Sequence, residues 1–389
     1  MRLLNTKTLK FKEFYDADIP KYAILSHCWG SNEIPYQDFQ SRRKRRGIGY
    51  RKIREFCRTA PEAARTYGLS IEWVWVDTCC IDKSSSSEVS EAINAMYSWY
   101  SQAALCCAYL SDVDCEPPRH EECKFEEFAE SRWWTRGWTL QELLACDTVE
   151  FFNSRWQLLG TKLDFSARIS ARTGIDAQFL ENSGYIRYAS VASRMSWASR
   201  RQTSRLEDMA YCLMGIFGVN MPLLYGEGRK AFRRLQEEII RTTPDESIFA
   251  WRPVDTRRDG GMLAESVRDF ADCRNIRKGF PQQSLHWKQD KPYAMTNFGL
   301  QMRTRYLEIP ASADYRLVGL HCCERGCDYP FFICLYNPLD KDGKRLGNAW
   351  SRRWNIEESL FQAFSPSSIW DLYRKGDLAF RCETVFLTL

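Results

Sequence analysis

One acidic side chain lies in a stretch rich in tryptophan, and this combination of residue types could support chemistry. Glu142 follows Trp133, Trp134 and Trp138 within ten residues. Apolar neighbours remove water from a carboxylate and raise its pKa, and aromatic rings can stack on a planar ligand. The alternative is structural: Glu142 would be a helix-surface carboxylate paired with Arg136 or another base, and the tryptophans would pack in the core.

A second group of candidate residues follows an apolar run at 22–25. Ser26, His27 and Trp29 stand where a buried strand is expected to end. Ligands of α/β proteins bind in the crevice at the carboxyl ends of the strands, so these three residues are candidates for a binding pocket. His27 could act as a general base, although a single histidine at a strand end is equally compatible with hydrogen-bonded structure.

Two aspartates flank the sequence Thr-Cys-Cys after the next expected strand. Asp77 and Asp82 could bind ribose hydroxyls or an arginine of a partner protein. Short acidic side chains also build turns by bonding to the backbone two residues further on. A turn-forming role, with Asp82 as a cap, therefore stays open for both.

The sixteen cysteines do not follow the spacing of a metal site or a disulfide framework. Many lie inside hydrophobic runs, which is typical of reduced, buried thiols. The nearest approach to ligand spacing is His321 with Cys323 and Cys327, and without a CxxC pair no metal is expected. Cys28 adjoins His27, but adjacent strand residues point to opposite faces, which disfavours a cysteine hydrolase.

The bulk composition is that of a globular protein that stays inside the cell. Of 389 residues, 44% are hydrophobic and the net charge is only +5, so nucleic-acid binding is not indicated. The one dense basic run, 42–46, is expected to be a solvated loop, with contact to phosphate or a membrane surface as the alternative. No apolar run approaches a membrane span or a signal peptide, so a cytoplasmic location is expected.

The elements that would position these residues alternate along the first half of the chain. Short apolar runs alternate with amphipathic stretches, a pattern that predicts βα units around a mostly parallel, doubly wound sheet of flavodoxin-like type. The expected strands are 22–26, 73–77, 105–110 and 149–152, and the expected helices are 52–67, 89–102 and 133–144.

The rest of the chain changes in character twice. Residues 158–247 have helical periodicity, with helices expected at 191–198, 205–217 and 228–241, and residues 248–389 show short strands and turns. The prediction is therefore an α/β domain over 1–157, a helical extension over 158–247 and a β-containing region of unknown role over 248–389.

The chain resembles fungal heterokaryon incompatibility (HET) domains. The resemblance rests on three long blocks in the family's order, and further blocks downstream extend it over about 1–251. The blocks are YAILSHCWG at 22–30, WVDTCCIDK at 75–83 and SRWWTRGWTLQELLA at 131–145, followed by MSWA at 195–198, RLEDMAY at 205–211 and PLLYGEG at 222–228. This resemblance implies an effector of vegetative incompatibility that recognises non-self and triggers programmed cell death.

A more distant resemblance is to TIR domains, several of which hydrolyse NAD. It rests on 91–97, on 105–110 and on the pattern Ser131, Trp138, Glu142 and Leu143. In those domains a glutamate on this helix faces the nicotinamide ribose, so the resemblance implies that Glu142 is the catalytic residue. With NAD as a substrate and not a resident cofactor, the candidates for binding it are Ser26, His27 and Trp29 at the strand end, Asp77 and Asp82 for ribose hydroxyls, and Trp138 for stacking.

Two classes of function remain as hypotheses. The first is an NAD glycohydrolase that becomes active after clustering, and the second is a non-enzymatic module that signals by homotypic assembly through its tryptophan-rich helix. A third hypothesis is an inactive copy whose tail from Ile248 onward is inhibitory. The chain has no GxxxxGK[ST] phosphate loop, so the expected partners are other copies of itself, a NOD-like receptor or another allele-specific protein.

Overall fold

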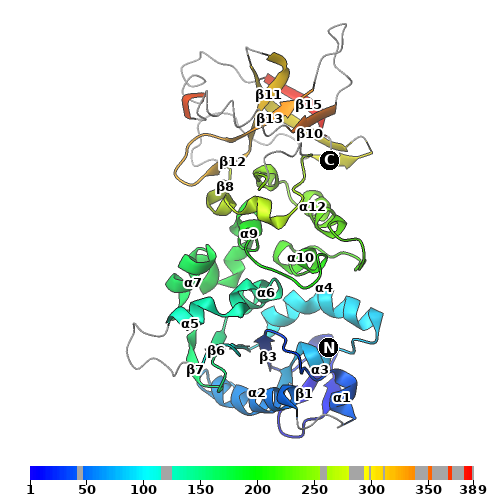
Figure 1. The fold of residues 1–389 in the computed structure, drawn as a ribbon, viewed down its shortest axis with the longest axis vertical. Coiled ribbons are helices and arrows are strands. Elements are labelled where there is room, and N and C mark those ends of the chain that lie inside the picture. Colours follow the sequence, from blue (N-terminus) through cyan, green and yellow to red (C-terminus); the bar gives the residue numbers. More distant parts are fainter. Residues whose placement is uncertain are drawn as a thin grey trace. The chain divides into compact units, whose positions relative to one another are not determined.

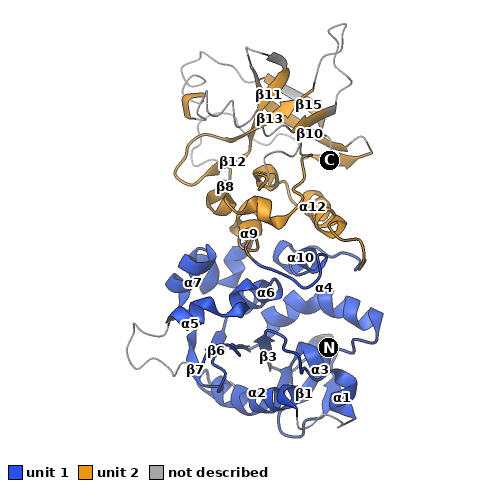
Figure 2. Cartoon of the chain, in the orientation of Figure 1, with its two compact units in different colours: residues 1–186, 201–224 blue, residues 187–200, 225–389 orange. Residues whose placement is uncertain are grey.

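The computed structural model describes residues 1–41, 47–114, 125–254, 261–279, 293–297, 299–309, 312–337, 349–352, 367–369 and 381–387. The basic run at 42–46 therefore lies outside the described residues. The chain forms two compact units, of which unit 1 comprises 1–186 and 201–224 and unit 2 comprises 187–200 and 225–389 (Figure 2). These units are defined by contacts in space and not by sequence. The predicted division into 1–157, 158–247 and 248–389 therefore stays a prediction.

Unit 1 is built on a seven-stranded sheet in the order β2-β1-β4-β3-β5-β6-β7. The central strands β4, β3, β5 and β6 are parallel, whereas β1, β2 and β7 pair antiparallel at the two sides. The strands are β1 Arg2–Asn5, β2 Phe11–Glu13, β3 Tyr22–His27, β4 Trp73–Trp75, β5 Leu105–Tyr109, β6 Val149–Phe152 and β7 Leu158–Thr161.

The parallel part of this sheet has the doubly wound order that the sequence predicts. The chain passes from β3 to β4 on one side and then returns to β5 on the other side of β3, which makes the carboxyl end of β3 the topological switch point. All six residues of β3 are buried, as expected for a central parallel strand covered on both faces. The α/β fold class is thereby confirmed.

Helices cover both faces of the sheet. Figure 1 shows α2 (Ile48–Arg65) on one face and both α4 (Ser86–Gln102) and α6 (Trp138–Ala145) on the other. Helix α2 contacts β3 and β5, whereas α6 contacts β3 and α4. Unit 1 also contains η1 Asp16–Asp18, α1 Tyr36–Gln40, α3 Asp77–Cys80, α5 Phe125–Glu130, η2 Arg132–Thr135, α7 Ser166–Thr173, α8 Ala177–Glu181, α10 Asp208–Tyr211 and α11 Met214–Phe217.

The prediction of one continuous helix over 133–144 is wrong. The segment is a 3-10 turn, η2, followed after a break by α6. At the break the Gly137 N–H donates to the Gln202 carbonyl at 2.8 Å, and the Gln202 N–H donates to the Thr135 carbonyl at 2.6 Å. A distant segment therefore takes backbone hydrogen bonds that a helix would have made internally. The expected helix at 205–217 is also divided, into the two short helices α10 and α11.

Unit 2 combines short helices with a β-rich part, as predicted for the C-terminal region. Its six-stranded sheet has the order β11-β13-β14-β15-β10-β9, and β10 also pairs with β11, which closes a ring of five strands. The strands are β8 Ile276–Lys278, β9 Ala294–Thr296, β10 Gly299–Ile309, β11 Ser312–Leu320, β12 Cys322–Glu324, β13 Phe331–Tyr336, β14 Ala349–Arg352 and β15 Arg381–Leu387. The helices include α9 Val191–Ser196, α12 Lys230–Thr242, η4 Glu246–Phe249, η5 Val267–Phe270 and η6 Cys273–Asn275.

Among the described residues, no helix combines the length and the apolar character needed to cross a bilayer.

Candidate functional site

Glu142 is a buried carboxyl group held against the end of the central strand. It lies in α6, and only 7% of the residue is exposed. The Ser26 hydroxyl at the end of β3 donates a hydrogen bond to Glu142 Oε2. The Arg136 guanidinium bonds to Ser204 instead, so the surface ion pair considered from the sequence is not formed.

Trp133 determines how the Ser26 hydroxyl is oriented. Its indole Nε1 donates to Ser26 Oγ at 2.8 Å, and Ser26 is completely buried. An indole N–H can only donate, so the serine oxygen accepts from Trp133 and its own hydrogen is left for Glu142. The three side chains form a chain of hydrogen bonds that presents one fixed donor to the carboxyl group.

Burial raises the pKa of Glu142 to about 8. Loss of solvent around the carboxyl group is the main cause, and the negative charge of Asp77 acts in the same direction. The hydrogen bond from Ser26, the charge of Arg201 and the contact with the Tyr100 hydroxyl lower the pKa. The sequence-based expectation of a desolvated carboxyl group with a raised pKa is confirmed. Glu142 can therefore exchange a proton near neutral pH, which ordinary glutamates do not do.

The structure adds two residues to this site that sequence reasoning missed. Arg201 is 3% exposed, and its Nη1 donates to Thr139 Oγ1 at 2.9 Å while its Nη2 is buried without a hydrogen bond. Tyr100 is buried and donates from its hydroxyl to the Leu25 carbonyl at 3.0 Å. Neither residue is near Glu142 in the sequence, and no local pattern distinguishes them from other arginines and tyrosines.

His27, on the opposite side of β3 from Ser26, belongs to a separate polar cluster. Its Nε2 lies 3.8 Å from Glu33 Oε2 and 3.8 Å from Asp77 Oδ1, too far for hydrogen bonds. These three atoms are buried, and none of them has a hydrogen-bond partner among the residues that the structure describes. Burial and the charges of Lys52 and Lys83 hold the pKa of His27 well below its usual value, so the imidazole is neutral and forms no ion pair.

The outer atoms of this cluster are firmly held. Trp29 Nε1 donates to Asp77 Oδ2 at 2.6 Å, and Lys52 Nζ lies 2.6 Å from Glu33 Oε1. Lys83 Nζ lies 3.4 Å from the centre of the half-exposed Trp29 ring. Burial raises the pKa of Asp77, although Lys83 and Trp29 oppose that shift. Asp77 and Glu33 are therefore each held through one carboxylate oxygen, while the other oxygen faces His27 Nε2.

Asp82 and Trp138 take other positions. Asp82 Oδ1 accepts from the Ser84 backbone N–H at 2.9 Å and the Ser84 hydroxyl at 2.6 Å, which is the turn considered as its alternative role. The same Asp82 oxygen bonds to Gln37, and these hydrogen bonds lower the pKa of Asp82. Trp138 is half-buried at the start of α6, beside Gly137.

The geometry does not favour a thiol or a metal at this site. Burial raises the pKa of the Cys28 thiol to about 12, so at neutral pH it carries no thiolate. Within the part of the chain that the structure describes, no group of three or more His, Cys, Asp or Glu is arranged to hold a metal ion.

The raised pKa of Glu142 predicts a pH-dependent stability. Because the folded-state pKa of about 8 exceeds the ordinary 4.5, the folded protein holds this proton more tightly than the unfolded chain does. Its contribution is complete below pH 4.5 and is lost as the pH rises to about 8. Melting temperatures between about pH 5 and pH 9 should fall less steeply with pH in Glu142→Gln than in the wild type.

A second buried glutamate supplies the control for that measurement. Burial raises the pKa of Glu246 in η4 to about 7. Glu246→Gln should therefore also flatten the fall of melting temperature with pH, but only up to about pH 7, whereas Glu142→Gln should flatten it up to about pH 8. Equal slopes for the wild type and Glu142→Gln would show that Glu142 is not protonated in the folded protein.

Comparison with known proteins identifies the class of domain. Residues 22–122, which include β3, the His27 cluster and β5, match the family model of the heterokaryon incompatibility protein (HET). The matched segment is therefore a HET domain, as the sequence motifs predicted. Residues 230–261 match a second model, which describes a domain of unknown function (DUF8212).

A relative of the chain extends this comparison beyond the family model. The vegetative incompatibility protein HET-E-1 of Podospora anserina is 42% identical over 268 residues, a match that covers 66% of this chain and 19% of the relative. The chain thus corresponds to about a fifth of that protein. No solved structure shows significant similarity to this chain.

Proposed function

We propose that this chain acts in vegetative incompatibility, and that its HET domain triggers cell death by hydrolysing NAD after the protein is clustered. The observation that carries the proposal is the buried Glu142, with its pKa of about 8, at the switch point of a doubly wound sheet. The similarity to HET-E-1 supports the biological role, and the resemblance to TIR domains supports the chemistry.

The proposed reaction breaks the bond between nicotinamide and ribose. Nicotinamide leaves with the bonding electron pair, an oxocarbenium-like centre develops on the ribose, and water adds to give ADP-ribose and a proton. A carboxylate beside the ribose stabilises the developing positive charge and orients a hydroxyl group. Glu142 supplies that carboxylate in its ionised form, and the positive charge of the nicotinamide ring in NAD favours ionisation.

The polar cluster around His27 is the proposed contact for the rest of the substrate. The unused atoms of His27, Glu33 and Asp77 can bond to ribose hydroxyls, because neutral imidazole and carboxylate oxygens accept from hydroxyl groups. The half-exposed Trp29 ring can stack on a planar base. Ser26 would orient Glu142 through its hydrogen bond. Asp82 and Trp138 stay proposed binding residues on the basis of the sequence.

A time course of NAD loss tests the proposal. We expect purified protein fused to an oligomerising tag to convert NAD to nicotinamide and ADP-ribose, and the untagged protein to convert much less. Product analysis by chromatography separates glycosidic cleavage from other losses of NAD. If the clustered protein kills cells on expression but leaves NAD intact, the proposed NAD hydrolysis is wrong and signalling by protein assembly is favoured.

The assembly hypothesis has less support from the tryptophan-rich segment than the sequence suggested. Trp133 and Trp134 are 1% and 5% exposed and both pack against Phe151, whereas Trp138 is half-buried. Self-association, a NOD-like receptor or another allele-specific protein remain the proposed partners, and the cytoplasm remains the proposed location.

A further inference from the structure

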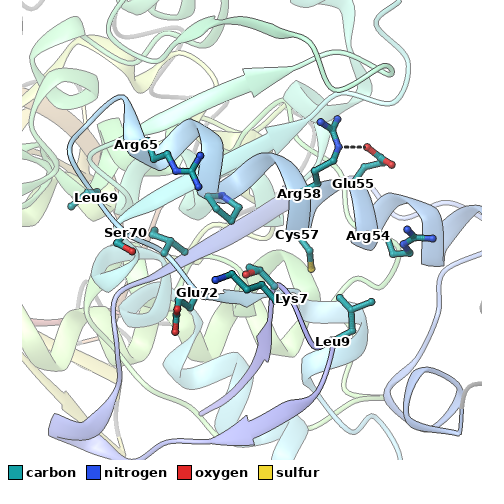
Figure 3. A pocket seen from close by; sticks show the side chains of 13 residues that line it. Lys7, Leu9, Arg54, Glu55, Cys57, Arg58, Arg65, Leu69, Ser70 and Glu72 are labelled. Carbon is teal, nitrogen blue, oxygen red and sulfur yellow. Dashed lines mark hydrogen bonds and ion pairs between the residues drawn. The ribbon is translucent and has the colours of Figure 1, made fainter.

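A cavity of about 500 Å³ in unit 1 is lined by none of the residues around Glu142 or His27. Three segments form it: the turn between β1 and β2, one face of α2, and the chain that leads into β4 (Figure 3). The lining residues are Thr6, Lys7, Leu9, Arg54, Glu55, Cys57, Arg58, Pro61, Arg65, Leu69, Ser70, Ile71 and Glu72.

The charged side chains of this lining are mainly cationic. The lining contains four cationic side chains and the two carboxylates of Glu55 and Glu72. Of the four cations, Arg58 forms ion pairs, with Glu55 at 3.0 Å and with Glu62 at 3.8 Å. Among the described residues, Lys7, Arg54 and Arg65 have no ion-pair partner. The cavity is thus a concave surface with an excess of positive charge.

Helix α2 concentrates this charge on one side. Arg54, Arg58 and Arg65 stand at positions i, i+4 and i+11, which lie on the same helical face as Pro61. Like charges at this spacing repel each other and lower the stability of the helix. An anion in the cavity would relieve that repulsion, and arginine forks bind phosphate oxygens in pairs.

The opposite wall is a rigid turn that holds Lys7 and Leu9 at the cavity. The Asn5 side-chain oxygen accepts from the Lys7 and Thr8 backbone N–H groups at 3.2 and 2.9 Å. The Leu9 N–H donates to the Asn5 carbonyl at 3.0 Å. Leu9 has a φ of 53°, a left-handed backbone conformation that leucine rarely adopts. Leu9, Leu69 and Ile71 add apolar surface beside the charges.

We propose that this cavity binds a small molecule that carries a phosphate group and is about the size of a mononucleotide. Arg65 and Lys7 bind the phosphate. Arg54, which lies about 16 Å from Arg65 along α2, and the apolar residues contact the remainder of the molecule. A phosphate dianion matches the excess of two positive charges in the lining, and the volume is within the range of small-ligand sites. The proposal does not depend on the chemistry at Glu142.

Calorimetric titration of the purified chain with AMP and with inorganic phosphate tests this inference. We expect AMP to bind more tightly than phosphate, and Arg65→Gln and Lys7→Gln each to weaken AMP binding by about tenfold, as expected for one lost charge-assisted bond. Arg51→Gln is the matched control, because Arg51 is exposed on the same helix but does not line the cavity. It should bind AMP as the wild type does.

Three results would overturn the proposal. These are no binding of either probe at millimolar concentration, an equal loss of affinity in Arg51→Gln, and saturable binding to vesicles containing phosphatidic acid without binding to AMP. The last result would assign the phosphate to a lipid headgroup. Glu142→Gln should bind AMP normally, so a failure of the NAD hydrolysis proposal and a failure of this one are distinguishable.

Discussion

Glu142→Gln should lower the rate of NAD loss in the clustered protein by about 100-fold or more, the usual effect of removing a group that acts on the reacting centre. The amide keeps the size of the side chain and can still accept from Ser26, but it cannot become negative beside the ribose. Glutamine also resembles the protonated acid that burial favours at neutral pH, so the variant should fold. The initial rate of nicotinamide release is the measurement.

Glu150→Gln is the matched control for this variant. Glu150 is a buried glutamate in β6 of the same unit, its pKa is also raised by burial, and it accepts from the Tyr67 hydroxyl at 2.9 Å. Its replacement should leave NAD loss within about twofold, because surface and buried changes away from the reacting centre act mainly on stability. Equal losses in the two variants would mean that Glu142 acts through the fold.

The dependence of the rate on pH gives an independent test of the same role. If the ionised form of Glu142 is the active one, the wild-type rate should rise with pH up to about 8 and then level off. Any residual rate of Glu142→Gln should lack that rise. A rate that falls over this range would instead identify the protonated acid as the active form.

Gly49→Ala is expected to destabilise the protein by about 3 kcal/mol or more, at the upper end of the cost of overpacking a core. A β-carbon at Gly49 in α2 would lie 2.3 Å from the Asn32 carbonyl oxygen and 3.1 Å from Glu33 Cα. Both atoms belong to the backbone, which cannot rotate away as a side chain can. Because the neighbouring segment carries Glu33, the substitution should also disturb the polar cluster around His27. Denaturant unfolding followed by tryptophan fluorescence measures the effect.

Gly30→Ala is the control that shows whether the loss of stability in Gly49→Ala comes from the close approach of α2 to the backbone of Asn32 and Glu33. Its added β-carbon would meet only Glu33 Oε1, at 3.8 Å, and Gly30 does not have a left-handed backbone conformation. Stability should change little, or rise slightly through the lower entropy of the unfolded chain. A wild-type midpoint for Gly49→Ala would mean that α2 and the 32–34 segment are not packed as described.

Several features of the fold followed from periodicity alone. The predicted strand at 149–152 coincides with β6, and the predicted helix at 89–102 lies within α4, whose cap is Ser85. Runs of buried residues and capping serines are local signals, so they can be read without knowing which segments meet. The identity of the HET domain also followed from local blocks of sequence.

The arrangement around Glu142 was predictable only in part. Its aromatic neighbours indicated desolvation and a raised pKa, and both are present. The hydrogen bond from Ser26, the contact with Tyr100 and the charge of Arg201 come from residues 116, 42 and 59 positions away. No single sequence pattern couples such distant segments, because they meet only when β3, α4 and α6 pack together.

By itself, the sequence determined the class of domain, the doubly wound order of strands and helices, and the presence of one acidic residue in apolar surroundings, because each depends on neighbours along the chain. Tertiary structure alone decided that the helix breaks at Gly137, that Trp133 and Trp134 are core and not surface, and that His27 and Ser26 lead to separate polar clusters. Those outcomes depend on where distant backbone groups find hydrogen-bond partners and how much water each side chain loses.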